Sequence, residues 1–279
     1  MAWSAVVSEA REEAVRPSRI RPLLASFAPW IVPLVLLLLW EAAARFGLVT
    51  ARLMPAPSTV ALAGWKALLD GTLVHHTLIS TQRALVGLLI GGGLGFLLGL
   101  LNGLWKPAET LLDSTLQMLR NIPHLALIPL VILWFGIDET AKIFLVAIGV
   151  FFPLYINTFH GVRTVDPQVI EMARVYGLDR AALIRRIILP GALPSILVGL
   201  RYSLGLMWLT LIVAETISAN AGIGYMTMNA REFFMTDVVL LGIILYALLG
   251  KLADLATRLL ERRLLRWHPA YQANHGDRN

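Results

Sequence analysis

The chain has 279 residues, of which 57% are hydrophobic and only 15% are charged, and it contains no cysteine. Soluble domains are roughly a quarter charged, so this composition leaves too little polar surface for a water-soluble protein and also excludes disordered, collagen-like and disulfide-stapled classes. The net charge of +6 fits a nucleic-acid partner or a membrane, so the positions of the 24 Lys and Arg residues must decide between the two.

Six segments are apolar enough for membrane-spanning helices, each of which needs about 20 residues. They lie at 27–46, 80–104, 119–136, 140–161, 193–219 and 237–259. The third is short and is interrupted by Pro123 and Pro129. The sequence therefore predicts an all-α, polytopic membrane protein. Its parts are a cytoplasmic N-terminal segment 1–26, a six-helix transmembrane domain 27–260 and a cytoplasmic C-terminal tail 261–279.

The first apolar segment also resembles a cleavable signal peptide that would end near Ala44. Such a signal would be much longer than the usual length of roughly 15–30 residues. Acidic residues at Glu9, Glu12 and Glu13 also dilute its basic leading part. We therefore expect this segment to remain as a membrane helix.

The distribution of basic residues orients the six spans. If the N-terminus is inside, most of the Lys and Arg residues fall on the inner side, whereas the clearly outer loops hold only Arg52, Lys66 and Arg231. Basic residues in short loops stay preferentially in the cytoplasm. Both termini should therefore be cytoplasmic, in a multi-pass membrane protein. The lipid bilayer then accounts for the basic charge, and no nucleic-acid partner is expected.

The outer loop 47–79 contains a candidate interfacial helix, ALAGWKALL, for which Ser58 or Thr59 is a suitable N-cap. The alternative is an ordinary connector.

Glycines recur every fourth residue along the second span. They are Gly87, Gly91, Gly95, Gly99 and Gly103. Small residues at this spacing form a groove that lets another helix approach closely within lipid. The groove predicts a tightly packed neighbour, either in the same chain or in a second subunit.

One face of the fifth span carries Arg201, Gly205, Trp208, Ile212 and Glu215. Ionisable groups at membrane depth are costly unless they are paired or face a wet interior. This face should therefore point into the helix bundle. It either lines a translocation path or holds a structural Arg and Glu that reach opposite interfaces.

The loop between spans four and five, residues 163–190, predicts two short helices. Asp166 and Pro167 are typical of a helix start, and Gly177 is well placed to end that helix. Asp179 can cap a second helix over about 180–188, which should stop ahead of Pro190. An ordered loop of this kind favours a docking site, with a solvated helical hairpin as the alternative.

At these residues the sequence resembles the EAA loop of ABC importer permeases, which couples the membrane subunit to its ATPase. The matching positions are Glu171, Met172, Ala173, Gly177, Ile187, Leu189 and Pro190. Met172 departs mildly from the motif, because Met and Ala have similar helix propensities. The resemblance extends over roughly residues 27–272. It is closest to aliphatic-sulfonate permeases, whose core is shared by taurine, nitrate and pyrimidine-precursor permeases.

The resemblance implies a type I ABC importer permease fold and a permease homodimer in the bacterial inner membrane. It also implies two copies of a cytoplasmic ABC ATPase and a substrate-binding protein that is periplasmic or lipid-anchored. The chain lacks a G-x-x-x-x-G-K-[ST] phosphate loop, so ATP and Mg should be bound by the ATPase and no cofactor by this chain. Metal-site spacings and a G-x-S-x-G elbow are also absent from the sequence, so we expect neither a metal site nor a catalytic residue.

Hydrogen-bond donors and cations in or near the spans are candidates for a path that carries an anion such as a sulfonate. They are Asn121, His124, Trp134, Asn157, His160, Arg201, Trp208, Thr210 and Ser218. Glu215 is added because it lies on the face of the fifth span that carries Arg201 and Trp208. Helix capping and hydrogen bonding between helices are the alternative roles of these residues. Specificity can also reside largely in the external binding protein.

Alternative functions are a permease for another small anion or a taurine-like or nitrate-like solute, a secondary transporter and a membrane-embedded enzyme. A secondary transporter should bury carboxylates mid-span, and Glu215 lies near a span end. An enzyme should show a nucleophile, metal or dinucleotide motif, and we recognise none in the sequence.

Overall fold

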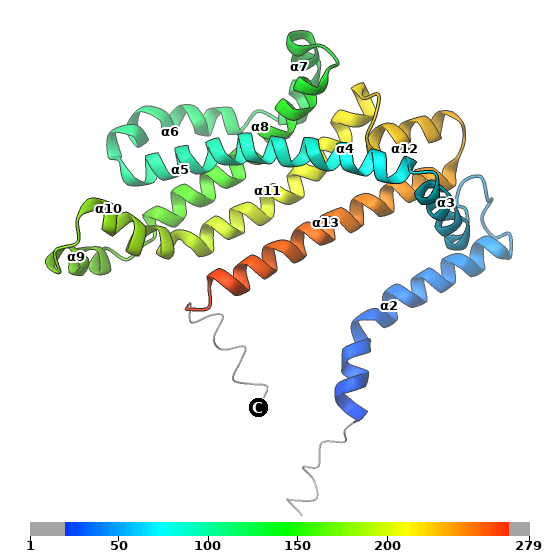
Figure 1. The fold of residues 1–279 in the computed structure, drawn as a ribbon, viewed down its shortest axis with the longest axis horizontal. Coiled ribbons are helices and arrows are strands. Elements are labelled where there is room, and N and C mark those ends of the chain that lie inside the picture. Colours follow the sequence, from blue (N-terminus) through cyan, green and yellow to red (C-terminus); the bar gives the residue numbers. More distant parts are fainter. Residues whose placement is uncertain (1–19, 268–279) are drawn as a thin grey trace, which may run out of the picture. The chain divides into compact units, whose positions relative to one another are not determined.

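The computed structural model describes residues 20–267, with side chains from Ile31 onward except that of Ser218. Most of the predicted N-terminal segment 1–26 and about half of the tail 261–279 therefore lie outside the described residues. Within residues 20–267 the chain is helical and contains no strand, as predicted (Figure 1).

The α-helices follow one another with short connections. They are α2 (Ile20–Arg45), α3 (Pro57–Leu69), α4 (Thr72–Gly87), α5 (Gly93–Leu104), α6 (Lys106–Arg120), α7 (Ile128–Phe135), α8 (Glu139–Arg163), α9 (Pro167–Val175), α10 (Arg180–Leu183), α11 (Leu189–Ser218), α12 (Ile223–Glu232) and α13 (Thr236–Leu264). Two π-helical turns, Leu88–Gly92 and Ile184–Ile188, join α4 to α5 and α10 to α11. These turns make longer continuous helices.

Four continuous helical stretches among the described residues are long and apolar enough to cross a bilayer. They are Thr72–Leu104, Glu139–Arg163, Arg180–Ile217 and Thr236–Leu264. They correspond to the predicted second, fourth, fifth and sixth spans. The predicted first span, 27–46, falls on α2, whose side chains are described only in part.

The third span, predicted at 119–136 with interruptions at Pro123 and Pro129, is broken at Pro123, whereas Pro129 lies in the first turn of α7. α6 ends at Arg120, and a short 3-10 turn, His124–Leu127, leads into α7. The two arms are bent by 81°, so this region is a broken span or a re-entrant loop (Figure 1). Pro123 causes the break, because its backbone is extended and it disfavours helix in the preceding residue.

The chain divides into two compact units, residues 1–62 and 63–279. In the first unit, Glu41 near the end of α2 accepts hydrogen bonds from the backbone N–H of Ser58, at 3.0 Å, and from its hydroxyl, at 2.8 Å. Ser58 lies in the first turn of α3, where backbone N–H groups lack partners within the helix. The predicted helix therefore exists, but the predicted caps Ser58 and Thr59 are wrong, because the helix begins earlier, at Pro57.

In the second unit, α8 packs against α5 and α11. The glycine groove faces α8, since a Cβ added at Gly87, Gly99 or Gly103 would lie 2.5–2.7 Å from the nearest atom of that helix. At Gly91 and Gly95 the added atom would overlap the carbonyl oxygens of Ala147 and Phe151. The tightly packed neighbour of this groove is thus in the same chain.

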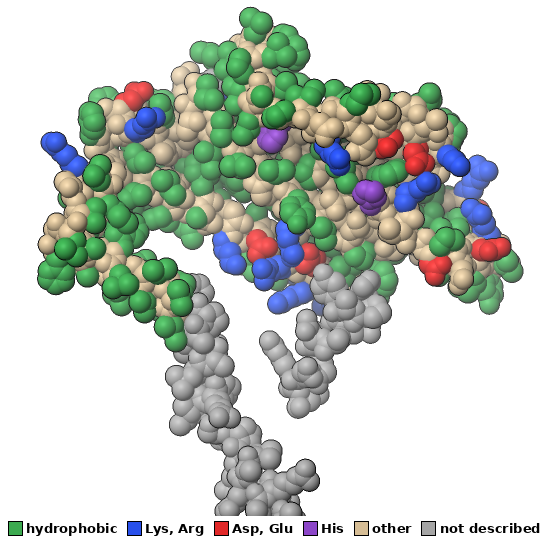
Figure 2. Space-filling model, turned by 180° about the vertical axis from the view of Figure 1, so that it is seen from behind, with side chains coloured by type: hydrophobic (Ala, Val, Ile, Leu, Met, Phe, Trp, Pro, Cys, Tyr) green, Lys and Arg blue, Asp and Glu red, His purple; other side chains and the backbone are tan. Residues whose placement is uncertain are grey.

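Large apolar side chains remain exposed over much of the second unit. Leu89, Leu133 and Leu248 are 74%, 79% and 55% exposed. Hydrophobic side chains also cover the projecting α7 in the space-filling view (Figure 2). Exposure on this scale is typical of surfaces that contact lipid or another subunit.

Candidate functional site

The loop 163–190 contains the two predicted helix starts. A side-chain oxygen of Asp166 accepts a hydrogen bond from the N–H of Gln168 at 2.8 Å, and one of Asp179 accepts from Ala182 at 2.9 Å. Gly177 follows α9 with a φ of +79°, a left-handed conformation that glycine adopts without steric cost. The predicted pair of helices joined at Gly177 is therefore confirmed.

The second of these helices does not stop ahead of Pro190, contrary to the prediction. α10 passes through the π-helical turn Ile184–Ile188 directly into α11, and Pro190 lies in the first turn of α11. A π-helical turn shifts the backbone hydrogen-bond register by one residue, which accommodates the missing N–H of a proline. From Arg180 onward, the second part of the loop and the fifth span thus form one continuous helix.

The residues that resemble the EAA motif fall into an inner and an outer group. Ala173 is buried and packs with Ile188, while Ile187 is half-buried against the same cluster. Glu171 and Met172 are exposed, and Met172 is 52% exposed. Gly177 is also exposed, and Leu189 and Pro190 are half-buried. The loop therefore has a packed inner side and an accessible outer side.

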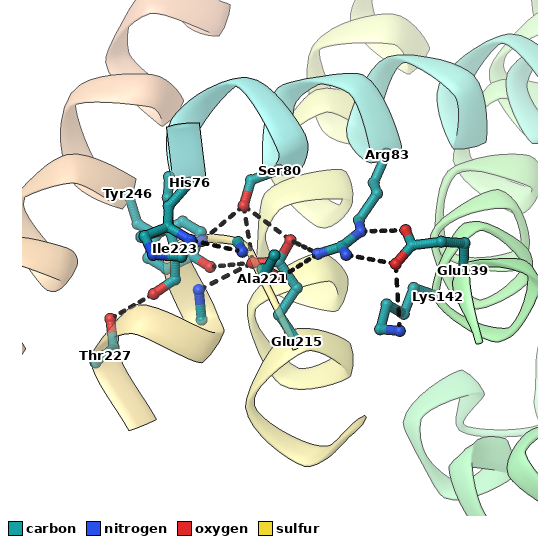
Figure 3. A network of polar contacts seen from close by, with 12 residues as sticks. His76, Ser80, Arg83, Glu139, Lys142, Glu215, Ala221, Ile223, Thr227 and Tyr246 are labelled. Carbon is teal, nitrogen blue, oxygen red and sulfur yellow. Dashed lines mark hydrogen bonds and ion pairs between the residues drawn. The ribbon is translucent and has the colours of Figure 1, made fainter. Parts of the chain in front are cut away.

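A buried carboxylate, Glu215 of α11, lies at the centre of a polar network (Figure 3). It accepts hydrogen bonds from the Ser80 hydroxyl at 2.8 Å, Arg83 Nη1 at 2.7 Å and the Gly224 N–H at 2.9 Å. The Tyr246 hydroxyl donates a fourth at 3.2 Å. With a side-chain exposure of 0%, Glu215 is compensated entirely by these donors from α4, α12 and α13.

The guanidinium of Arg83 also bridges to a second carboxylate, Glu139 (Figure 3). Arg83 Nε and Nη2 each donate to one oxygen of Glu139 at 2.5 Å. Lys142 Nζ lies 3.6 Å from Glu139 Oε1 and donates to the Ile137 carbonyl at 2.8 Å. The Arg83 and Lys142 side chains are only 5% and 3% exposed, whereas that of Glu139 is 59% exposed.

The same network holds the start of α12. The N–H groups of Gly222, Ile223 and Gly224 donate to His76 Nδ1, Ser80 Oγ and Glu215 Oε2, respectively. Three of the otherwise unpaired N–H groups at this helix start are thereby satisfied. The turn before α12 is consequently fixed to α4 and α11.

The predicted face of the fifth span is paired at both ends within the chain. Arg201 Nη2 donates to Glu261 of α13 at 2.7 Å, and Glu215 belongs to the network above. Between them, Trp208 is buried, and its ring centroid lies 6.4 Å from that of Tyr246. Gly205 is exposed. The face therefore lies mainly against α12 and α13.

The remaining predicted path residues are scattered. His124 Nε2 and Thr210 Oγ1 lie 3.1 Å apart and join the broken segment to α11. Asn157 donates to the Pro153 carbonyl, and its own carbonyl accepts from Ser195. Three others, Asn121, Trp134 and His160, are exposed, and the side chain of Ser218 lies outside the described part of the chain.

Sequence reasoning missed most of the network around Glu215. The missed residues are His76, Ser80, Arg83, Glu139, Lys142 and Tyr246. A signal was present at Arg83, because an ionisable residue inside an apolar span is itself a functional-site hypothesis. In residues 20–267 we find no group of three or more His, Asp or Glu side chains placed to hold a metal ion.

The fold and these sites define a polytopic helical membrane protein with a structured loop between two of its spans. Residues 91–266 match the family described as binding-protein-dependent transport system inner membrane component, and the chain belongs to this family. It is the permease subunit of an ABC transporter in the inner membrane and is not itself an enzyme.

Relatives include two proteins named as aliphatic sulfonates transport permeases SsuC. That of Escherichia coli is 60% identical over 90% of this chain and 96% of its own length. That of Bacillus subtilis is 47% identical over 93% of this chain and 94% of its own length. The taurine transport system permease TauC of E. coli is 39% identical over 85% of this chain and 88% of its own length.

Solved structures of ABC transporters share the fold at low sequence identity. An amino acid ABC transporter crystallised with histidines has a TM-score of 0.59 at 18% identity, over 74% of this chain and 98% of that one. The inward-facing MetNI methionine transporter has a TM-score of 0.52 at 19% identity, over 70% of this chain and 97% of that one.

Proposed function

We propose that this chain is the permease of an ATP-driven importer that moves aliphatic sulfonates into the cell by alternating access. The observation that carries this proposal is the order of its relatives. Two permeases named for aliphatic sulfonates are 60% and 47% identical, the taurine permease is 39% identical, and a riboflavin permease of Chloroflexus aurantiacus is 33% identical. Taurine is itself an aminosulfonate, so the proposed solute and that of this relative share one head group.

The proposed complex contains two copies of this permease, two ATPase subunits that bind ATP and Mg, and an external substrate-binding protein. The family description supports the last of these, since it names binding-protein-dependent systems. We place both termini and the loop 163–190 in the cytoplasm because most basic residues lie on that side. The network around Glu215 then lies near the outer surface.

We assign the docking of the ATPase to the exposed side of the loop 163–190. Glu171 and Met172 are accessible there, while Ala173 and Ile187 hold the loop to the helices behind it. ATP binding would move this loop and bias the spans between two states.

For the solute path we propose Trp208 and Asn157 as the first residues to test, with the other predicted path residues as a wider set. Trp208 Nε1 is a buried donor that has no hydrogen-bond partner among the described residues, and such a donor suits an oxyanion. Unchanged sulfonate uptake by both Trp208→Ala and Asn157→Ala would remove these residues from the path.

Uptake of labelled ethanesulfonate by the complete importer in proteoliposomes tests the function. We expect ATP-dependent uptake that requires the binding protein and is inhibited by other alkanesulfonates. Uptake of nitrate or another small anion, with ethanesulfonate ignored, would instead establish the alternative solute. Failure of a Walker-motif ATPase to co-purify with the permease would contradict the importer itself.

A further inference from the structure

We propose that Arg83 and Lys142 form a binding site for a monoanionic sulfonate, and that the carboxylate of Glu139 occupies this site when the solute is absent. The proposal rests on the proposed function for the choice of solute. It also rests on the proposed orientation, which places the site in the outer half of the stretch Thr72–Leu104 and at the outer end of α8. The path residues suggested by the sequence do not include these three.

Burial differs sharply between the cations and the carboxylate of this cluster. The side chains of Arg83 and Lys142 are at least 95% buried, whereas Glu139 is 59% exposed. An exposed carboxylate can leave an ion pair at little cost, because water solvates it. Buried cations cannot lose their counter-charge so cheaply. Departure of Glu139 would therefore leave two fixed cations that need another anion.

The guanidinium of Arg83 is held in one orientation. Arg83 Nη1 is held by Glu215 and by the Ala221 carbonyl, which fixes the plane of the group. Its opposite edge, Nε and Nη2, contacts both oxygens of Glu139. A guanidinium edge matches any pair of oxygens on one central atom, as in carboxylates and phosphates. Two oxygens of a sulfonate fit the same edge.

A third sulfonate oxygen would then be available to the ammonium of Lys142. Lys142 Nζ already lies 3.6 Å from the Glu139 oxygen that Nη2 contacts, and its donation to the Ile137 carbonyl leaves it further hydrogens to donate. In the pairing with Glu139, Nη2 and Nζ share one carboxylate oxygen, and Nζ is the more distant of the two. A sulfonate has three oxygens, so it can give Nζ an oxygen of its own at hydrogen-bond distance.

The charges of the cluster favour a monoanion. The cluster holds two cations, Arg83 and Lys142, and two carboxylates, Glu139 and Glu215 (Figure 3). When Glu139 leaves, the buried residues Arg83, Lys142 and Glu215 together retain a net charge of about +1. A monoanion neutralises this charge, whereas a dianion such as sulfate leaves an uncompensated negative charge in a poorly solvated place. The site should thus distinguish alkanesulfonates from sulfate.

Binding of labelled ethanesulfonate to the complete importer in lipid nanodiscs, without its binding protein, tests the proposal. Glu139→Gln removes the charge of the internal competitor, so we expect ethanesulfonate to bind roughly tenfold more tightly than to the wild type. Lys142→Gln should weaken binding by about the same factor. Sulfate should compete poorly in every case. The control variants are Glu232→Gln and Arg231→Gln, which change exposed charges near the end of α12.

Thermal unfolding of each variant shows whether it remains folded. Ethanesulfonate affinity that is unchanged or lower in a folded Glu139→Gln variant would overturn the proposal. So would equal affinity for sulfate, or absence of binding in both wild type and Glu139→Gln. These results leave the importer function intact if the wild type still takes up ethanesulfonate with its binding protein. Loss of that uptake in the wild type would contradict the proposed function itself.

Discussion

The Ser80 hydroxyl donates a hydrogen bond to the Glu215 carboxylate at 2.8 Å, although the two residues are 135 positions apart in the chain. The same oxygen of Ser80 accepts the N–H of Ile223. One small side chain on α4 therefore connects α11 to the start of α12. Buried hydrogen bonds of this kind fix helices that lipid alone would not hold in register.

Replacing Glu215 with Gln should destabilise the permease. The amide can keep an acceptor for Ser80, but Arg83 loses its buried counter-charge. Breaking a buried ion pair costs about 3–5 kcal/mol in soluble proteins. We expect a lower thermal unfolding temperature in detergent, measured by tryptophan fluorescence. Glu232→Gln, an exposed change on α12, should leave that temperature unchanged, and an equal effect of both variants would refute the structural role of Glu215.

Adding a methyl group at Gly91, in the π-helical turn ahead of α5, should push this turn and the start of α5 away from α8. The new Cβ would overlap the backbone of Ala147, which cannot move as a side chain can. Overpacking of this kind costs about 1–3 kcal/mol. Gly93→Ala is the matched control, because no atom lies within 4 Å of its Cβ and its backbone is helical. Thermal unfolding without denaturant measures the effect. The unfolding temperature of Gly91→Ala should fall below that of the wild type, whereas that of Gly93→Ala should be equal or higher.

Changing Gly177 to Val should damage coupling through backbone strain rather than through a clash. No atom lies within 4 Å of the added Cβ, but the φ of +79° is costly for a β-branched residue. Forcing an L-residue into this region costs about 1–2 kcal/mol. Gly177→Asn should be milder, since Asn tolerates the left-handed region.

ATP turnover by the assembled importer measures this effect. We expect Gly177→Val to assemble with the ATPase subunits but to lose the stimulation of ATP turnover by solute-loaded binding protein. Gly177→Asn should show a stimulation between those of the wild type and Gly177→Val. Normal transport by Gly177→Val in proteoliposomes would show that the turn does not contribute to coupling.

Removing the hydroxyl of Tyr155 should destabilise the contact between α5, α6 and α8. This hydroxyl accepts a hydrogen bond from Asn102 Nδ2 at 2.8 Å and donates to Asp113 at 2.9 Å. In Tyr155→Phe the buried Asn102 amide loses its partner, at a cost of about 1–3 kcal/mol. Tyr202→Phe, at an exposed site on α11, is the control. Equal melting temperatures for the two variants would contradict this account.

Local signals in the sequence were sufficient where one residue determines its own neighbourhood. Asp166 caps α9 and Gly177 ends it because caps and left-handed turns depend on residues a few positions apart. The spacing of the glycines likewise predicted a close helix contact, although only the structure identifies α8 as the partner.

Long-range contacts could not be predicted in the same way. Nothing near Arg83 in the chain indicates that its partners are Glu139 and Glu215, which lie on other helices. Pro190 misled the local reasoning, because a π-helical turn accommodated it within a continuous helix. Pro123 was different, because the sequence already indicated it as an interruption of the third span, and it lies between two arms bent by 81°.

The uninterrupted helix through Pro190 has a mechanical consequence. The 38-residue stretch Arg180–Ile217 is roughly 57 Å long if each residue adds about 1.5 Å. It begins in the loop assigned to the ATPase and reaches Glu215 near its far end. Under the proposed coupling, this helix would carry a tilt at the loop to the network around Glu215, with bending expected at the π-helical turn Ile184–Ile188 and at Pro194.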